Sequence, residues 1–162
     1  MIADDVRRQT KHIFQNIEAI FAAMDDALFA KRLGGFLVWK QMYHLIHSLD
    51  KNLVDPATYV EPTFHERNHD IVYLDDGRAL PKDELYDYYL GVRDKVERYL
   101  DGLDEGQLVQ IHPFHELRVS GLELILAQLR HVFYHVGYLH CCLKLEMGET
   151  PEYIGLYVTK PA

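Results

Sequence analysis

The sequence has little cysteine, no long hydrophobic run and no excess of positive charge, and each absence excludes a class of protein. Only two cysteines occur in 162 residues, adjacent at Cys141 and Cys142, which excludes a disulfide framework of the secreted type. No run of about 18 apolar residues occurs, so we expect no membrane-spanning helix. The first residues, MIADDVRRQTKH, have no apolar stretch, and we expect no signal peptide and a cytoplasmic location.

The charge balance and the missing motifs narrow the function further. The formal net charge is −8, from 25 acidic and 17 basic residues, without a basic block. Such a chain repels phosphate backbones at long range, so we expect no nucleic-acid partner. Glycine-rich phosphate loops, a serine nucleophile elbow and paired CxxC motifs are missing, which removes support for nucleotide-dependent and serine-hydrolase chemistry. Length and a hydrophobic content of 48% fit one domain over residues 1–162.

Four stretches of the chain have the apolar periodicity of amphipathic helices. They cover about residues 3–31, 36–54, 81–101 and 120–147. The last stretch opens with a capping box, Ser120-x-x-Glu123, and is followed by Gly148. A long connection, residues 55–81, is interrupted by proline and glycine. The pattern predicts an all-α fold, a four-helix up-down bundle with the long 55–81 connection.

Ten histidines are the most unusual feature of the composition. His131 and His135 are four residues apart, so their imidazoles lie on one helix face, a common helical half of a transition-metal site. His44 and His47, three apart on the second helix, supply a possible third ligand. All four lie away from the main apolar stripe of their helix, which predicts a polar groove between two helices. The alternative is a set of histidines held by hydrogen bonds or by solvent.

The predicted apolar stripe of the last helix determines where its histidines are expected. At about 100° per residue, both histidines fall opposite to this stripe. The stripe comprises Leu122, Ile125, Leu126, Leu129, Phe133, Val136 and Leu143.

A literal HExxH motif also occurs, at His65, Glu66 and His69. In metalloproteases this motif lies on a helix, which places two ligands one turn apart with the glutamate as general base. Pro62 lies just before the motif and β-branched residues follow it, so the local sequence disfavours a helix. A protease is therefore the less favoured interpretation.

Two segments resemble one known family. Residues 130–139, RHVFYHVGYL, are similar to the HxxxHxGxL signature that closes the last helix of the DinB-like (YfiT-type) superfamily of four-helix bundles. Residues 38–50, VWKQMYHLIHSLD, are similar to the second-helix pattern of that family, in which a His-Leu pair carries the remaining ligand. By helix order the resemblance extends over the whole chain.

The resemblance implies a three-histidine site for a divalent metal ion, zinc or nickel, with His44, His131 and His135 as ligands and His47 as the second choice on its helix. It implies metal-dependent chemistry on a small-molecule substrate. Transfer to or from a low-molecular-weight thiol is the first expectation and hydrolysis the next. Three neutral imidazoles leave the ion its full positive charge and an open position, as in catalytic sites.

Several expectations around this site stay open. Asp50 and the tyrosines Tyr43, Tyr134 and Tyr138 are candidates, on proximity alone, to orient the imidazoles. Apolar residues on nearly all sides of the last helix predict a second contact face and a homodimer. The alternatives are a non-catalytic, stress-associated protein in which the ion braces the bundle, and a degenerate protein that holds no metal.

Overall fold

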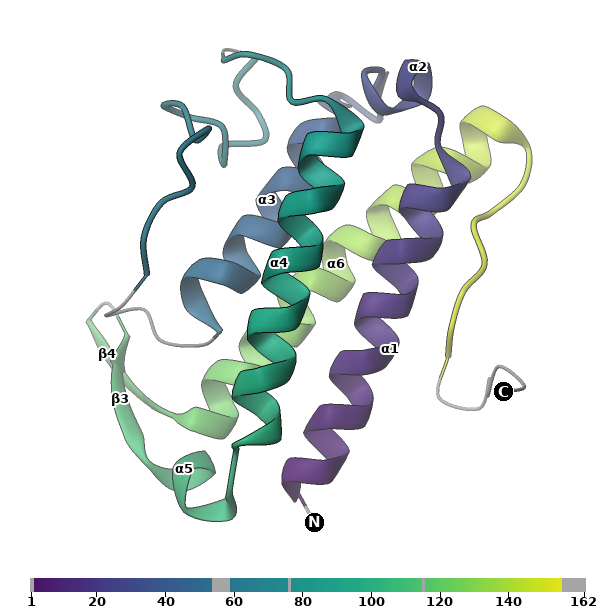
Figure 1. Cartoon of the computed structure of the whole chain (residues 1–162). Helices are drawn as coiled ribbons and strands as arrows, with labels where there is room; N and C mark the ends of the chain where they lie inside the picture. Colours follow the sequence, from purple (N-terminus) through teal and green to yellow (C-terminus); the bar gives the residue numbers. More distant parts are fainter. Residues whose placement is uncertain (1, 54–58, 76, 115, 156–162) are drawn as a thin grey trace.

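A computed structural model of the chain describes residues 2–53, 59–75, 77–114 and 116–155, which are mostly helical (Figure 1). This confirms the predominantly helical class. The strands form two separate antiparallel hairpins, β1–β2 and β3–β4. The elements are α1 (Ile2–Ala23), α2 (Asp26–Phe29), β1 (Arg32–Leu33), β2 (Phe36–Leu37), α3 (Val38–Asn52), α4 (Lys82–Asp101), α5 (Glu105–Val109), β3 (Ile111–Phe114), β4 (Leu117–Ser120) and α6 (Gly121–Met147).

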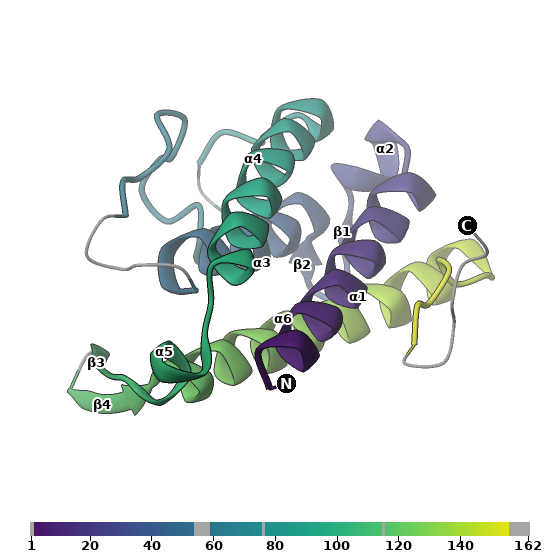
Figure 2. The ribbon, with the colours of Figure 1, turned by 60° about the horizontal axis from the view of Figure 1, so that its bottom comes forward.

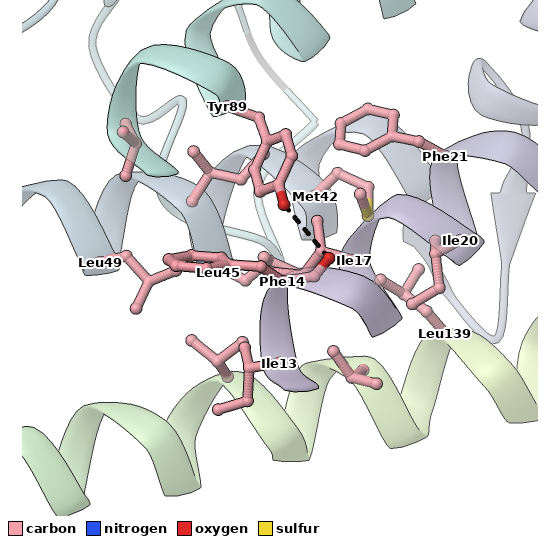
Figure 3. Packing of buried hydrophobic residues seen from close by; sticks show 14 of the residues in the cluster. Ile13, Phe14, Ile17, Ile20, Phe21, Met42, Leu45, Leu49, Tyr89 and Leu139 are labelled. Carbon is pink, nitrogen blue, oxygen red and sulfur yellow. Dashed lines mark hydrogen bonds between the residues drawn. The ribbon is translucent and has the colours of Figure 1, made fainter. Parts of the chain in front are cut away.

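The four long helices share one hydrophobic core. Helices α1 and α3 each pack against both α4 and α6. Ile17 of α1 and Leu45 of α3 are both fully buried in this core (Figure 3). The hydroxyl of the buried Tyr89 donates to the carbonyl of Phe14 at 3.2 Å, so this large core side chain leaves no unpaired polar atom. The described helices that carry His44, His131 and His135 are therefore held rigidly against one another.

The directions of the helices explain the long connection. Helices α1 and α6 run one way, and α3 and α4 run the other way (Figure 1). Because α3 and α4 are parallel, the chain must travel back along the molecule between them. Residues 55–58 and 76 of the expected 55–81 connection lie outside the described residues. Its described residues form turns without helix or strand.

Lys40 fastens the connection to α3. Its side chain is completely buried, and its ammonium group donates to the backbone carbonyls of Asn68, at 3.1 Å, and Leu74. The ring of Trp39 packs edge-on against His69, with the ring centroids 5.5 Å apart. The connection is thus held against the first turns of α3, next to the helix segment that carries His44 and His47.

The sequence pattern predicts the ends of α6 correctly but misses a break in the first predicted helix. The stretch predicted as one helix over 3–31 is divided, because the Asp25 carboxylate accepts a hydrogen bond from Leu28 N at 2.8 Å and caps a new helix, α2. Helix α6 begins as predicted, with the Ser120 hydroxyl accepting from Glu123 N at 3.1 Å. It ends at Gly148, whose φ of +82° closes the helix.

The second hairpin was not predicted from the sequence. Strands β3 and β4 lie beside the start of α6, far from hairpin β1–β2 (Figure 2). Ile111 and Leu117 of this hairpin are at least half exposed.

Among the described residues, no helix has both the length and the apolar character needed to cross a bilayer.

The buried face of α6 agrees with the predicted stripe in part. Four members of the stripe are buried, namely Ile125, Leu129, Val136 and Leu143. Leu126 of the stripe is 51% exposed, whereas Leu124, His135 and Cys142 on the opposite face are buried. Helix α6 is apolar on most sides, so periodicity cannot select the buried face. Contacts with α1 and α3 select it instead. His135 therefore lies in the buried helix interface.

Candidate metal centre

Three histidines meet between α3 and α6. The Nε2 atom of His44 lies 3.0 Å from Nε2 of His131, which lies 3.1 Å from Nε2 of His135. His44 comes from α3, and the other two lie one turn apart on α6, which packs directly against α3. The structure thus brings together the three residues that the sequence pattern singled out as candidate ligands.

Hydrogen bonds fix the tautomers of two of these rings. His44 Nδ1 donates to the backbone carbonyl of Asp70 at 2.6 Å, and His135 Nδ1 donates to Gln41 Oε1 at 2.7 Å. A carbonyl oxygen only accepts, so each neutral ring carries its proton on Nδ1 and a lone pair on Nε2. Both lone pairs lie within hydrogen-bond distance of the same atom, His131 Nε2.

His131 cannot satisfy both neighbours by itself. Its Nε2 atom carries at most one proton, so at least one of the two nitrogen contacts joins two lone pairs. Its Nδ1 atom is buried without a hydrogen-bond partner in the part of the chain that the structure describes. A cation shared by the three Nε2 atoms would remove the conflict. Zinc–nitrogen bonds of about 2.1 Å at tetrahedral angles place nitrogens about 3.4 Å apart, so the residues present fit such an ion.

Burial keeps two of the imidazoles in the form that binds metal. Burial, together with repulsion from His44 and His131, lowers the pKa of His135 to about 3. Burial and then repulsion from His44 lower the pKa of His131. His44 and His131 are only partly buried, whereas His135 is 6% exposed. Burial therefore favours the neutral form of His131 and His135, and the three-histidine cluster keeps one side toward solvent.

The residues that orient the cluster are not those expected from proximity. In the described structure, no hydrogen bond joins the three imidazoles to the expected side chains, which were Asp50, Tyr43, Tyr134 and Tyr138. The Asp50 carboxylate instead accepts from the Tyr88 hydroxyl at 2.9 Å and from Lys95 Nζ at 2.6 Å. Gln41 and Asp70 take the orienting positions. Gln41 precedes His44 by three residues, so helical spacing places both on the same face of α3 and could have identified Gln41. Asp70 acts through its backbone carbonyl, which helical spacing does not reveal.

His47 and the HExxH motif lie outside the three-histidine cluster. His47 is 3% exposed, and its Nε2 lies 2.7 Å from Glu61 Oε2. Residues 65–69 form turns, so the helix that a metalloprotease motif requires is not present. His69 is buried, with Nε2 at 3.4 Å from Glu66 Oε2. The arrangement of a protease site is therefore not formed.

Comparison with known proteins adds information on the fold. No family model matches the chain, and no curated protein does. The chain is similar to a crystal structure described as a conserved protein from Enterococcus faecalis, with a TM-score of 0.66 and 16% sequence identity. The similarity covers 92% of this chain and 99% of the other. At this identity the likeness shows a shared fold and nothing of the function.

Proposed function

We propose that this chain is a divalent-metal-binding protein of the DinB-like superfamily, a four-helix bundle whose long 55–81 connection joins the parallel helices α3 and α4. One zinc or nickel ion is held by His44, His131 and His135. The observation that carries the proposal is the approach of three Nε2 atoms to within 3.0 and 3.1 Å, with two lone pairs aimed at one place by fixed tautomers. Hydrogen bonding alone cannot satisfy that arrangement.

The proposed activity is metal-dependent chemistry on a small molecule, with transfer of a low-molecular-weight thiol first and hydrolysis next. A bound divalent cation supplies Lewis acidity, which lowers the pKa of a coordinated thiol or water. The chain contributes three neutral imidazoles, which do not reduce the charge of the ion. Tyr134 is 71% exposed, and its ring lies perpendicular to that of His135 with the ring centroids 5.2 Å apart. It is therefore placed to contact a substrate.

A second candidate function is that of a non-catalytic protein in which the ion braces the helices. The bond from His44 to the Asp70 carbonyl favours it, because the same ring that would bind the ion also ties the connection to α3. The two functions differ in whether a coordination position is open. In Co²⁺-loaded protein, a small thiol such as cysteine would change the visible spectrum of an open site and leave a brace unchanged.

The first experiment measures metal content by elemental mass spectrometry on untagged protein, since an affinity tag would add histidines. We expect His131→Ala to remove one ion per chain relative to the unmodified protein. His140→Ala is the matched control, because His140 lies on the same helix outside the cluster. A protein that refuses added zinc and nickel, or a His131→Ala variant with unchanged metal content, contradicts the proposal.

We also propose a homodimer through the outer face of α6 and hairpin β3–β4. Leu126 and Leu117 are 51% and 64% exposed, and both line a surface hollow of about 440 Å³ together with Phe114 and Val119. Burial of these side chains in a second copy would remove apolar surface from water. Light scattering should give twice the chain mass, and Leu126→Glu should halve it. A monomeric mass for the unmodified protein contradicts the dimer.

A further inference from the structure

A second cluster of ligand-type side chains lies where the long connection crosses α3. One ligand atom each from His47, Glu61 and His65 lies within 4.8 Å of the others. His47 belongs to α3, whereas Glu61 and His65 belong to the connection. The cluster contains no residue of the three-histidine cluster, so it requires a separate explanation.

Three short contacts meet at the centre of this second cluster, but at most two protons are available there to form hydrogen bonds. His47 Nε2, Glu61 Oε2 and the Tyr59 hydroxyl oxygen form a triangle whose three sides all measure 2.7 Å. The hydroxyl carries one proton and His47 Nε2 at most one, while the carboxylate carries none. Three ligating atoms thus crowd one place with at most two hydrogens between them.

His65 completes the donor set. Its Nδ1 atom lies 3.7 Å from Glu61 Oε2, and its ring stacks on that of His47 with the centroids 5.0 Å apart. The hydroxyl of the fully buried Tyr43 lies 2.5 Å from the same Nδ1 atom. The ring is therefore held in place beside the carboxylate by a core side chain.

Burial and hydrogen bonding act in opposite directions on the pKa values of His47 and Glu61. Burial lowers the pKa of His47, although the hydrogen bond to Glu61 acts in the opposite direction. Burial alone would raise the pKa of Glu61, but hydrogen bonds from His47, Tyr59 and Lys51 outweigh it and hold the pKa at about 2.

We propose that His47, Glu61 and His65 form a second divalent-cation site, separate from the His44 site. Two imidazoles and one carboxylate are a donor set that suits zinc. Donor atoms about 2.1 Å from such an ion lie about 3.0–3.4 Å apart, so entry of the ion needs the 2.7 Å contacts to open by a few tenths of an ångström. The Tyr59 hydroxyl borders the site.

The second site has a structural effect on the first. The connection that carries Glu61 and His65 also carries Asp70, whose carbonyl orients His44. An ion bound to His47 on α3 and to the two connection residues would join these segments. The second ion therefore fixes the segment that prepares the first site. This effect rests on the proposed function, whereas the binding itself does not.

The test counts bound Zn²⁺ and Co²⁺ per chain in full-length, untagged, metal-stripped protein after equilibrium dialysis. We expect two ions in the unmodified protein, one in Glu61→Gln, one in His65→Gln and one in His131→Ala. The double variant Glu61→Gln/His131→Ala should hold none. The Glu61 side chain is 43% exposed, so Glu61→Gln changes charge without disturbing the core, and thermal unfolding followed by circular dichroism checks this.

The remaining outcomes separate the two proposals. A single ion that is lost in His131→Ala and unaffected by Glu61→Gln overturns the second site and leaves the proposed function intact. A single ion that is lost in Glu61→Gln and kept in His131→Ala supports the second site and overturns the first. Two ions that both survive Glu61→Gln and His65→Gln overturn the second site, and protein without any bound ion overturns both.

Discussion

Gln41 Oε1 accepts a hydrogen bond from His135 Nδ1 at 2.7 Å, across the contact between α3 and α6. Gln41 is 4% exposed, so no solvent competes for the bond. Because the amide oxygen only accepts, it holds the His135 proton on Nδ1 and leaves the lone pair of Nε2 directed at the cluster. One uncharged side chain thus determines the coordinating atom of a candidate ligand.

Replacing Gln41 by leucine should weaken metal binding without unfolding the protein. The variant keeps a similar side-chain volume but removes the acceptor, and loss of such an orienting partner lowers metal affinity by about 10- to 100-fold. Competition with a chromophoric chelator measures the effect. The matched control is Gln128→Leu, because Gln128 is also buried but bonds Ser48 and no histidine. Equal losses in both variants would indicate disturbed packing and contradict the role of Gln41.

Replacing His69 by alanine should leave all bound metal in place. His69 is fully buried against Trp39 and has no place in either ligand set, although it belongs to the HExxH motif. His65→Gln should remove one ion, which separates the two histidines of that motif. Elemental mass spectrometry of both variants checks the prediction. An ion lost in His69→Ala and kept in His65→Gln would contradict this ligand assignment.

Replacing Gly77 by alanine should destabilise the fold more than the same change at Gly35. Both glycines have positive φ, +92° and +98°, so alanine is strained at either position by about 1 kcal/mol. A Cβ atom on Gly77 would also lie 2.6 Å from Cδ2 of the buried His69, whereas a Cβ on Gly35 meets no atom within 4 Å. We expect an additional loss of about 1–2 kcal/mol for Gly77→Ala. Urea unfolding measures both, and equal losses would contradict the close packing of His69.

Acid should destabilise the metal-stripped protein partly through His140. Burial lowers the pKa of this imidazole, and its Nε2 has no hydrogen-bond partner in the described structure. The pKa of His140 in the folded protein lies below its value of about 6.5 in the unfolded chain, so the unfolded chain takes up the proton first. The folded state therefore keeps its full stability above pH 6.5 and loses stability as the pH falls below that value. His140→Phe keeps the ring that faces Tyr153 and removes the titration. The urea midpoint of the variant should fall less between pH 7 and pH 5, and identical slopes would contradict the prediction.

Helix α6 shows how much of the fold the sequence could predict. Its two ends depend on local chemistry, the Ser120 hydroxyl at the start and the positive φ of Gly148 at the end, and both were predicted. Its buried face depends on which helices cover it, and a helix that is apolar on most sides does not encode that choice. Leu126 was therefore placed in the core, although it is half exposed.

In the candidate site, too, some residues could be predicted from the sequence and others could not. Side-chain spacing singled out His44, His131 and His135, because imidazoles at helical spacing are recognisable before folding is known. Asp70 contributes a backbone carbonyl, which every residue possesses, so no pattern could have identified it. His47 was considered only as a substitute for His44. Its partner Glu61 comes from an irregular connection whose path no periodicity describes.

The separation of 87 residues between His44 and His131 has a consequence for biosynthesis. A nascent chain that has emerged only through α4 contains one of the three proposed ligands, and that one lacks its partners on α6. High-affinity capture of the ion at this site therefore has to follow emergence of α6 from the ribosome. Metal delivery would then meet a chain whose four long helices have all been synthesised.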